Sequence, residues 1–363
     1  MTSPTKQLHE AGQSLWLDNL TRTMLDDGTL EGHIRDLGIT GQTSNPSIFD
    51  KALGAGDAYD RQVGELHERG LGDEEIFYEV AISDIRRACD LFAETHRASA
   101  RYDGWVSLEV SPLMAYDTRA TLDWARLLHN RTDRDNLFVK IPGTPEGLPA
   151  IEESIYAGIP INVTLLFDRD QYLASADAYL RGLERRVADG LPPDVCSVAS
   201  IFMSRWDVAV QDRVPEPLRG KLGLAVGGKA YKAYRELLRS DRMLRLMNAG
   251  ARPQRLLWAS TGTKDPSLSD TLYVDGLFAP LTINTMPDST LAAVADHGAV
   301  PERVLPDDGI EAEAALDDFE REGIDVDALA AQLQSEGAEA FVKSWRGLLE
   351  TIASKRAALA GAS

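Results

Sequence analysis

The sequence predicts an α/β fold, a (β/α)₈ TIM barrel with additional helices. Short apolar runs alternate with amphipathic helical patterns along the chain, as in proteins built around a parallel sheet. The 363 residues suffice for one barrel with extra helices. An open doubly wound sheet is the alternative, but the first predicted strand lacks the glycine-rich turn that usually follows in such sheets.

Eight runs are rich in apolar and β-branched residues, which is typical of parallel strands covered on both faces. They are residues 14–17, 38–43, 105–110, 137–141, 160–166, 196–202, 255–259 and 281–284. Between the runs, apolar residues recur with helical spacing, most clearly over residues 76–92. The same spacing predicts helices over residues 118–129, 145–156, 169–188, 205–214 and 230–248.

The composition changes after about Ala299, which predicts a barrel domain (residues 1–299) and an acidic helical extension packed on it (residues 300–363). Residues 301–363 hold 14 acidic and 6 basic side chains. Helically spaced apolar residues in the extension, including Phe341 and Trp345, predict that it packs on another surface. A solvated helix face explains the acidity, and a partner-binding tail is the alternative.

The net charge is −19 at pH 7, and a field of this sign repels nucleic acid and anionic membranes. Two cysteines and six scattered histidines predict neither a disulfide framework nor a zinc site. The polar start does not resemble a signal peptide, and no stretch approaches the ~20 apolar residues of a membrane span. We therefore expect a cytoplasmic monomer or homodimer with no metal, cofactor, nucleic-acid or membrane partner.

Barrel enzymes carry their catalytic groups at the C-terminal ends of the strands. The predicted strands place these polar residues there: Asp18, Asn45, Glu109, Lys140, Thr164, Ser200, Ser260 with Lys264, and Asn284. Of nine lysines, Lys140 alone lies inside an apolar strand. Burial favours the neutral form of an amine, and a neutral amine attacks a carbonyl to form a Schiff base. A lysine that extends from the strand end to a surface carboxylate is the structural alternative.

A Schiff-base reaction that breaks a C–C bond also needs a carboxylate to accept a hydroxyl proton. Asp18 and Glu109 are the candidates because they lie on predicted strands, whereas most acidic residues lie on helices. Thr164 is a candidate for positioning a water molecule in a proton relay. Each of the three also fits a purely structural role.

Residues 223–230 nearly match a phosphate-binding loop, through Gly223, Gly228 and Lys229. Ala230 stands where the Mg²⁺-binding hydroxyl is required, and no strand precedes the segment. We interpret it as a turn that leads into the helix predicted over residues 230–248.

Four segments resemble signature motifs of the transaldolase family. They are GQTSNPSIF (residues 41–49), LFVKIPGT (137–144), INVTLLF (161–167) and APLTINTMP (279–287). Their order and spacing match the long members of the family from about Ser14 to Gly298. The resemblance implies a class I aldolase-type barrel and a transferase of the pentose phosphate pathway that moves a dihydroxyacetone unit. Sedoheptulose 7-phosphate or fructose 6-phosphate would be the donor, and glyceraldehyde 3-phosphate or erythrose 4-phosphate the acceptor.

The resemblance also implies roles for the residues at matching positions. Lys140 would form the Schiff base, and Asp18 would act as acid and base on the C4 hydroxyl. Glu109 and Thr164 would hold a water molecule that shuttles protons. No metal or cofactor is implied.

The remaining implied roles concern substrate binding. Asn45, assisted by Ser200, would bind the dihydroxyacetone hydroxyls, and Arg205 would bind the sugar phosphate through its guanidinium. Many family members have a second phosphate-binding arginine in the segment aligned with residues 258–264, where this chain has none. We expect Lys264 to supply the charge there and Ser260 a hydroxyl.

Three alternatives remain open. A fructose 6-phosphate aldolase would release free dihydroxyacetone, although such relatives are much shorter. A catalytically silent barrel would bind sugar phosphates as a sensor or scaffold. An interaction protein would act through the acidic extension.

Overall fold

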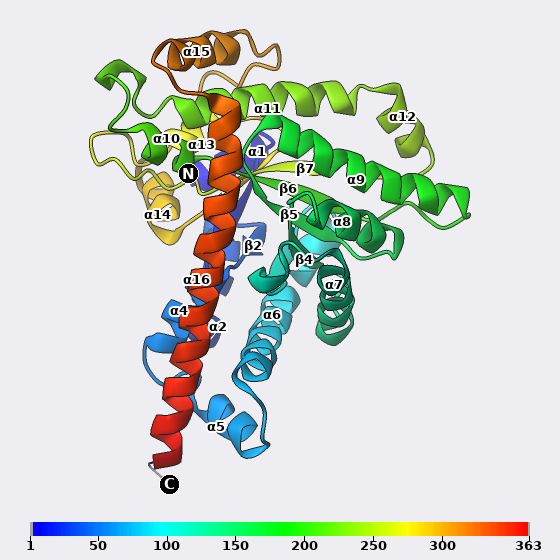
Figure 1. The fold of residues 1–363 in the computed structure, drawn as a ribbon, viewed down its shortest axis with the longest axis vertical. Coiled ribbons are helices and arrows are strands. Elements are labelled where there is room, and N and C mark those ends of the chain that lie inside the picture. The colour runs from blue at the N-terminus through cyan, green and yellow to red at the C-terminus, as the bar shows by residue number, and fades with distance from the viewer. Residues whose placement is uncertain (1–2, 362–363) are drawn as a thin grey trace.

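In the computed structural model, which describes residues 3–361, eight parallel strands close into a barrel (Figure 1). The strands are β1 (Ser14–Asp18), β2 (Gly41–Thr43), β3 (Trp105–Glu109), β4 (Leu137–Pro142), β5 (Ile161–Leu166), β6 (Ser197–Phe202), β7 (Arg255–Ala259) and β8 (Ile283–Met286). Each strand pairs with the next one in the sequence, and β8 pairs with β1. The predicted (β/α)₈ barrel is therefore confirmed.

Helices follow the strands and surround the barrel (Figure 1). Up to β5 they are α1 (Pro4–Glu10), α2 (Arg22–Asp26), α3 (Thr29–Gly32), α4 (Pro46–Gly54), α5 (Asp60–Glu68), α6 (Asp73–Ala98), α7 (Thr118–Thr132) and α8 (Gly147–Tyr156). Later ones are α9 (Arg169–Ala188), α10 (Ser204–Val210), α11 (Leu222–Leu238), α12 (Asp241–Asn248), α13 (Leu272–Gly276), α14 (Asp288–His297), α15 (Ile310–Arg321) and α16 (Val326–Gly361).

Two strands differ from their predicted positions by more than one residue at an end. β2 begins at Gly41 rather than residue 38, because Gly38 has φ +69° and ends a preceding helical turn. A β-carbon on Gly41 would lie 2.4 Å from the Trp16 ring, so only glycine fits at this barrel position. The last strand was predicted at residues 281–284, but Leu281 has φ +69° and β8 runs over Ile283–Met286.

Two helix predictions and one turn prediction were wrong in detail. The helix predicted over residues 230–248 is interrupted at Ser240, whose hydroxyl accepts a hydrogen bond from the Met243 amide and caps α12. The turn predicted at residues 223–230 lies inside α11. Its glycines allow close packing, since a β-carbon on Gly227 would lie 2.5 Å from the Leu277 side chain. The helix predicted over residues 205–214 ends at Val210, shortly before Pro215.

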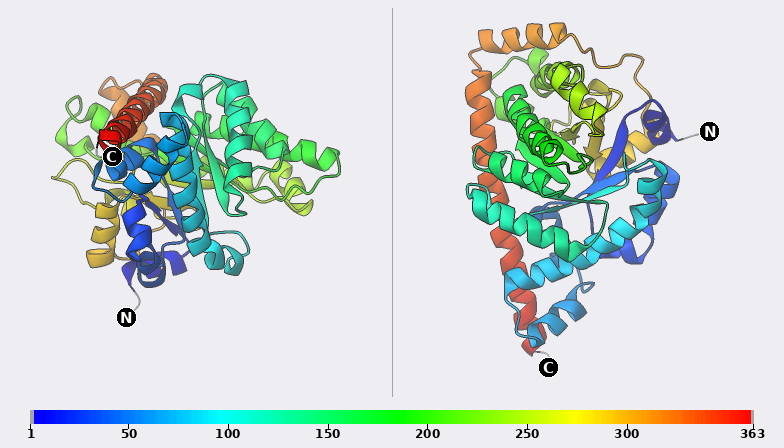
Figure 2. Two further views of the ribbon diagram at one scale, coloured as in Figure 1. Left: turned by 90° about the horizontal axis from the view of Figure 1, so that it is seen from below. Right: turned by 90° about the vertical axis from the view of Figure 1, so that its right-hand side faces the viewer.

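The acidic extension is helical and reaches across the molecule. α16 runs from α15 at one end to α5 at the other (Figure 1 and Figure 2), and it contacts α4, α5, α6 and β5. Up to Phe341, its buried residues share one apolar cluster with residues at the ends of β5 and β6, including Phe167 and Phe202, whereas Trp345 and the buried residues after it belong to the main core. The division into two domains near residue 299 stays a prediction. No helix within residues 3–361 combines the length and hydropathy that crossing a bilayer requires.

Candidate active site

A cavity of about 190 Å³ lies at the C-terminal ends of the barrel strands. Seven of the nine predicted site residues line it: Asp18, Asn45, Lys140, Thr164, Ser200, Arg205 and Ser260. Glu109 contacts Lys140 beside this cavity, and Lys264 lies elsewhere. The barrel thus brings together side chains that are widely separated in the sequence.

Lys140 is held by neighbours on β3 and directly after β2. Glu109 and Lys140 are register partners on adjacent strands, which places their side chains next to each other. Lys140 Nζ lies 3.2 Å from Glu109 Oε2, and both side chains are less than 10% exposed. Nζ also donates a hydrogen bond of 3.2 Å to the carbonyl oxygen of Ser44. The amine therefore faces the cavity with two groups beside it that bind its protons.

Glu109 and Thr164 flank this amine with unused hydrogen-bonding capacity. Burial raises the pKa of the Glu109 carboxyl, although the Lys140 charge opposes the shift. Among the residues that the structure describes, Glu109 Oε1 and Thr164 Oγ1 are buried without a hydrogen-bond partner. Buried polar atoms of this kind usually bind water or ligand.

Asp18 ends β1 on the other side of the cavity. Its Oδ1 accepts a hydrogen bond of 2.7 Å from Thr43 Oγ1, and Thr43 Oγ1 lies 2.7 Å from Thr285 Oγ1. Burial raises the pKa of the Asp18 carboxyl above its ordinary value, while Lys140 and Thr43 oppose the shift and Asp288 adds to it. Asp18 is therefore oriented by a hydroxyl and is a stronger base than an exposed aspartate.

Asn45 and Ser200 are oriented by bonds that leave them facing the cavity. Asn45 caps α4, where its Oδ1 accepts hydrogen bonds from the Ile48 amide and the Ser47 hydroxyl. Both bonds use the oxygen, so the amide nitrogen is left to donate to a ligand. Ser200 Oγ donates to Asn162 Oδ1 at 2.7 Å.

An aromatic wall encloses the cationic part of the cavity. The Phe341 ring, from α16, lies 5.7 Å from Lys140 Nζ and 6.0 Å from the guanidinium carbon of Arg205. The Phe202 ring lies 5.2 Å from the same guanidinium carbon. Arg205 is thus placed against two rings, which restricts its orientation. Burial lowers the pKa of the Arg205 guanidinium, although the charge of Glu336 opposes the shift.

Several cavity residues were not singled out from the sequence. Thr43 and Thr285 stand at the ends of β2 and β8. The rule that barrel enzymes carry catalytic groups at the C-terminal ends of their strands (the strand-end rule) was therefore sufficient to find them. We had placed Asn284 at the end of the last strand, but β8 is shifted, and Thr285 lines the cavity instead. Phe341 had no such signal, because only tertiary packing brings α16 to the barrel ends.

Lys264 is not brought into this cavity. Its side chain is exposed and lines a separate small depression with Asp207 and Arg219. Its Nζ lies 3.6 Å from the position that a β-carbon on Gly262 would occupy. Ser260 does line the cavity, and its Oγ lies 2.9 Å from Ser204 Oγ.

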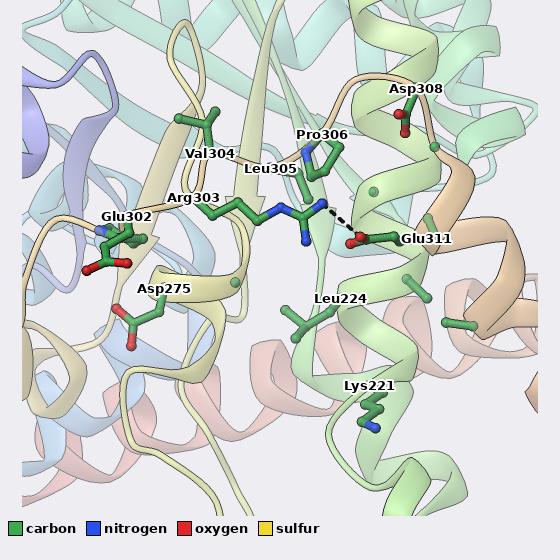
Figure 3. A pocket seen from close by; sticks show the side chains of 17 residues that line it. Lys221, Leu224, Asp275, Glu302, Arg303, Val304, Leu305, Pro306, Asp308 and Glu311 are labelled. Atoms are coloured by element: carbon green, nitrogen blue, oxygen red, sulfur yellow. Dashed lines mark hydrogen bonds and ion pairs between the residues drawn. The ribbon is translucent and has the colours of Figure 1, made fainter.

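A second, wider groove of about 600 Å³ lies between α11, α13 and residues 301–309 (Figure 3). The Arg303 side chain extends across this groove, and its Nη2 lies 2.8 Å from Glu311 Oε1, so the Glu311 carboxylate balances the positive charge of Arg303. None of the nine predicted site residues lines this groove. Within residues 3–361, no three His, Cys, Asp or Glu side chains are grouped closely enough to hold a metal ion.

Comparisons with known proteins agree with this geometry. The family model described as "Transaldolase/Fructose-6-phosphate aldolase" matches residues 15–352. The chain is 46% identical to a protein named Transaldolase from Thermobifida fusca, over 99% of this chain and 100% of that protein. It is 47% identical to a Transaldolase from Thiobacillus denitrificans, over 96% and 99% of the two chains. A Transaldolase from Mycolicibacterium smegmatis is 45% identical, over 94% and 95%.

Proposed function

Because the chain belongs to the transaldolase and fructose-6-phosphate aldolase family, we infer that it is a transaldolase that acts through a Schiff base on Lys140. The observation that carries this mechanism is the buried amine. Lys140 Nζ faces the cavity, 3.2 Å from the Glu109 carboxylate, in a ring of groups that suit a sugar phosphate. The transferred group is dihydroxyacetone.

The first step makes the amine a nucleophile. The ammonium of Lys140 transfers a proton to Glu109, whose raised pKa makes it a better proton acceptor than an exposed carboxylate. The neutral amine then attacks the C2 carbonyl of the ketose phosphate and forms a carbinolamine. A water molecule between Glu109 and Thr164 returns a proton to the C2 hydroxyl, which leaves as water, and the protonated imine remains.

The second step breaks the C3–C4 bond. Asp18 accepts the C4 hydroxyl proton, the aldose phosphate departs, and the bonding electrons move into the imine to give an enamine. The incoming aldehyde accepts the enamine carbon, and Asp18 returns the proton to the new hydroxyl. Hydrolysis of the product imine releases the ketose and restores Lys140, so ping-pong kinetics are expected.

Substrate binding is assigned to the remaining cavity residues. Asn45 and Ser200 bind the hydroxyls of the dihydroxyacetone unit, and Arg205 binds the phosphate by two parallel hydrogen bonds. Ser260 contributes a hydroxyl at the same end. Lys264 supplies the second positive charge, for which its side chain has to swing from its exposed position toward the cavity.

The substrates are the ketose and aldose phosphates of the pentose phosphate pathway: sedoheptulose 7-phosphate or fructose 6-phosphate as donor, and glyceraldehyde 3-phosphate or erythrose 4-phosphate as acceptor. The strongly negative chain favours neither nucleic-acid nor membrane partners. We place the enzyme in the cytoplasm, as a monomer or homodimer that needs no cofactor.

Borohydride trapping tests the mechanism. The protein is incubated with labelled fructose 6-phosphate, reduced, digested and mapped by mass spectrometry. A three-carbon adduct is expected on the peptide that contains Lys140, and Lys140→Ala should abolish it. Lys343→Ala is the matched control, since this exposed lysine lies on α16 between Phe341 and Ser344, which line the cavity, but itself lines a separate groove. An adduct that persists in Lys140→Ala would refute the assignment.

A fructose 6-phosphate aldolase is the second candidate, because the matching family model includes that activity. Such an enzyme would hydrolyse the bound dihydroxyacetone adduct without an acceptor. We expect little free dihydroxyacetone from fructose 6-phosphate alone and rapid turnover once erythrose 4-phosphate is added. Equal rates with and without the acceptor would favour the aldolase.

A further inference from the structure

Gln334 on α16 bridges the ends of two barrel strands. Its Nε2 lies 2.9 Å from the carbonyl oxygen of Leu165, on β5, and 3.2 Å from that of Gly143, just after β4. An amide nitrogen carries two N–H donors, so one Gln334 side chain is able to serve both carbonyls. The C-terminal helix is thus bonded to the backbone directly after Thr164 and three residues after Lys140.

The β5 end of this bridge is irregular. The register between β5 and β6 shifts between Val163 and Leu166, and Leu165 has φ +58°. This left-handed conformation is uncommon and unfavourable for a residue other than glycine, so neighbouring contacts must maintain it. The Leu165 side chain belongs to the same buried cluster as Leu333 and Phe341 of α16. α16 therefore holds Leu165 by both its side chain and its carbonyl group.

The strained residue is directly joined to Thr164. The Thr164 carbonyl accepts a hydrogen bond of 2.7 Å from the Gly143 amide, so the bridge, Gly143 and Thr164 form one continuous set of contacts. A β-carbon on Gly143 would lie 2.4 Å from the Leu166 side chain, which leaves this segment little room to move. The position of Thr164 Oγ1 in the cavity depends on this arrangement.

We propose that Gln334 is a positioning residue, which fixes Thr164 for the proton relay by holding the Leu165 and Gly143 carbonyls. The proposal rests on the function inferred above, in which Thr164 and Glu109 serve imine formation and hydrolysis. Loss of the bridge therefore slows those two steps. The C–C bond step uses Asp18, on the opposite side of the cavity, and is spared.

The test measures the two steps separately in Gln334→Leu and Gln334→Glu. Rapid mixing with fructose 6-phosphate, followed by borohydride at increasing times, gives the rate of imine formation at Lys140. In a second series, erythrose 4-phosphate is added before the borohydride, so that the unreduced three-carbon enamine forms a bond to the aldehyde. Borohydride added at increasing times then traps the larger adduct, whose mass reports C–C bond formation. Gln332→Leu is the matched control, because Gln332 is exposed on the same helix and bonds only to Glu336 among the contacts described.

In Gln334→Leu, we expect imine formation to slow by about tenfold or more, the scale of a disturbed proton relay. C–C bond formation should stay within about twofold of the wild type. In Gln334→Glu, a carboxylate would repel both carbonyls, whereas its protonated form donates one hydrogen bond. The imine rate of Gln334→Glu relative to the wild type should therefore rise as the pH falls. This pH dependence tests the positioning role of Gln334 even if Gln334→Leu does not fold.

Wild-type imine rates in both Gln334 variants would overturn the positioning role alone. An equal loss in both chemical steps would also overturn it, because that pattern indicates general disruption of the cavity. A wild-type protein without any adduct at Lys140 would instead overturn the proposed function, and the positioning role with it.

Discussion

Gly337 on α16 is the position where a single methyl group should disturb phosphate binding without unfolding the protein. A β-carbon there would lie 3.2 Å from Arg205 Nη1 and 3.0 Å from Leu165 Cδ2. Both separations are shorter than the ordinary contact range of 3.4–4 Å, so these neighbours have to shift by a few tenths of an ångström. Gly337→Ala therefore acts on the residue that we assign to the sugar phosphate.

The energetic effects of this substitution oppose each other. Alanine stabilises a helix interior by about 1 kcal/mol relative to glycine. The steric shift offsets part of that gain, so the unfolding temperature should change little. An arginine binds phosphate through directional, charge-assisted hydrogen bonds, each of which contributes about 1.5–3 kcal/mol. Losing one such bond would raise KM for phosphorylated substrates by about tenfold or more.

Gly347→Ala is the matched control on the same helix. A β-carbon on Gly347 would lie 3.4 Å from Asp50 Oδ2, within the ordinary contact range and away from Arg205. This variant should gain about 1 kcal/mol of stability and keep its kinetic constants. The assay compares steady-state KM for glyceraldehyde 3-phosphate and for unphosphorylated glyceraldehyde, with thermal unfolding of each variant. If Gly337→Ala gained as much stability as the control and kept its KM, the assigned packing and role of Arg205 would be refuted.

Three further predictions concern charged groups. Asp18→Asn should retain the Lys140 adduct and lose most turnover. This variant should also unfold at a higher temperature than the wild type near pH 7. Burial raises the pKa of the Asp18 carboxyl, so its ionisation lowers the stability of the wild type as the pH rises. The stability difference between the variant and the wild type should therefore shrink as the pH falls through that pKa. In the pH profile of wild-type kcat/KM, activity should be lost on acidification with an apparent pKa above the ordinary carboxylate range, because burial raises the pKa of both Asp18 and Glu109. An apparent pKa within the ordinary range would exclude these two residues as the titrating bases. Lys264→Ala should raise KM for phosphorylated acceptors severalfold, and an unchanged KM would remove that assignment.

The strand pattern and the strand-end rule were sufficient to predict the barrel and the position of Lys140. Parallel strands are continuously apolar, so a lysine within one is conspicuous, and the barrel topology collects the strand ends. Glycine was less informative. The glycines of residues 223–230 suggested a turn, but in α11 they allow close helix packing, and the sequence alone does not distinguish these two uses.

The contribution of α16 was not predictable from local patterns. Its helical periodicity indicated an apolar face, but not which surface that face covers. Phe341, Gln334 and Gly337 contact the barrel far from their own place in the sequence, through packing that only the folded chain creates. The left-handed conformation of Leu165 was equally hidden, because leucine gives no signal for it.

An anionic substrate has to enter a protein whose net charge is −19. At physiological salt the Debye length is about 8 Å, so most of the surface charge is screened from a substrate that is already inside the cavity. The Phe341 ring lies 5.7 Å from Lys140 Nζ and 6.0 Å from the guanidinium carbon of Arg205, the two groups that we assign to the substrate. The extension that supplies much of the negative charge therefore also supplies an apolar wall beside these two groups. Its acidity and its contact with the cavity are compatible because most of its acidic residues precede α16 in the sequence, whereas Phe341 lies on α16.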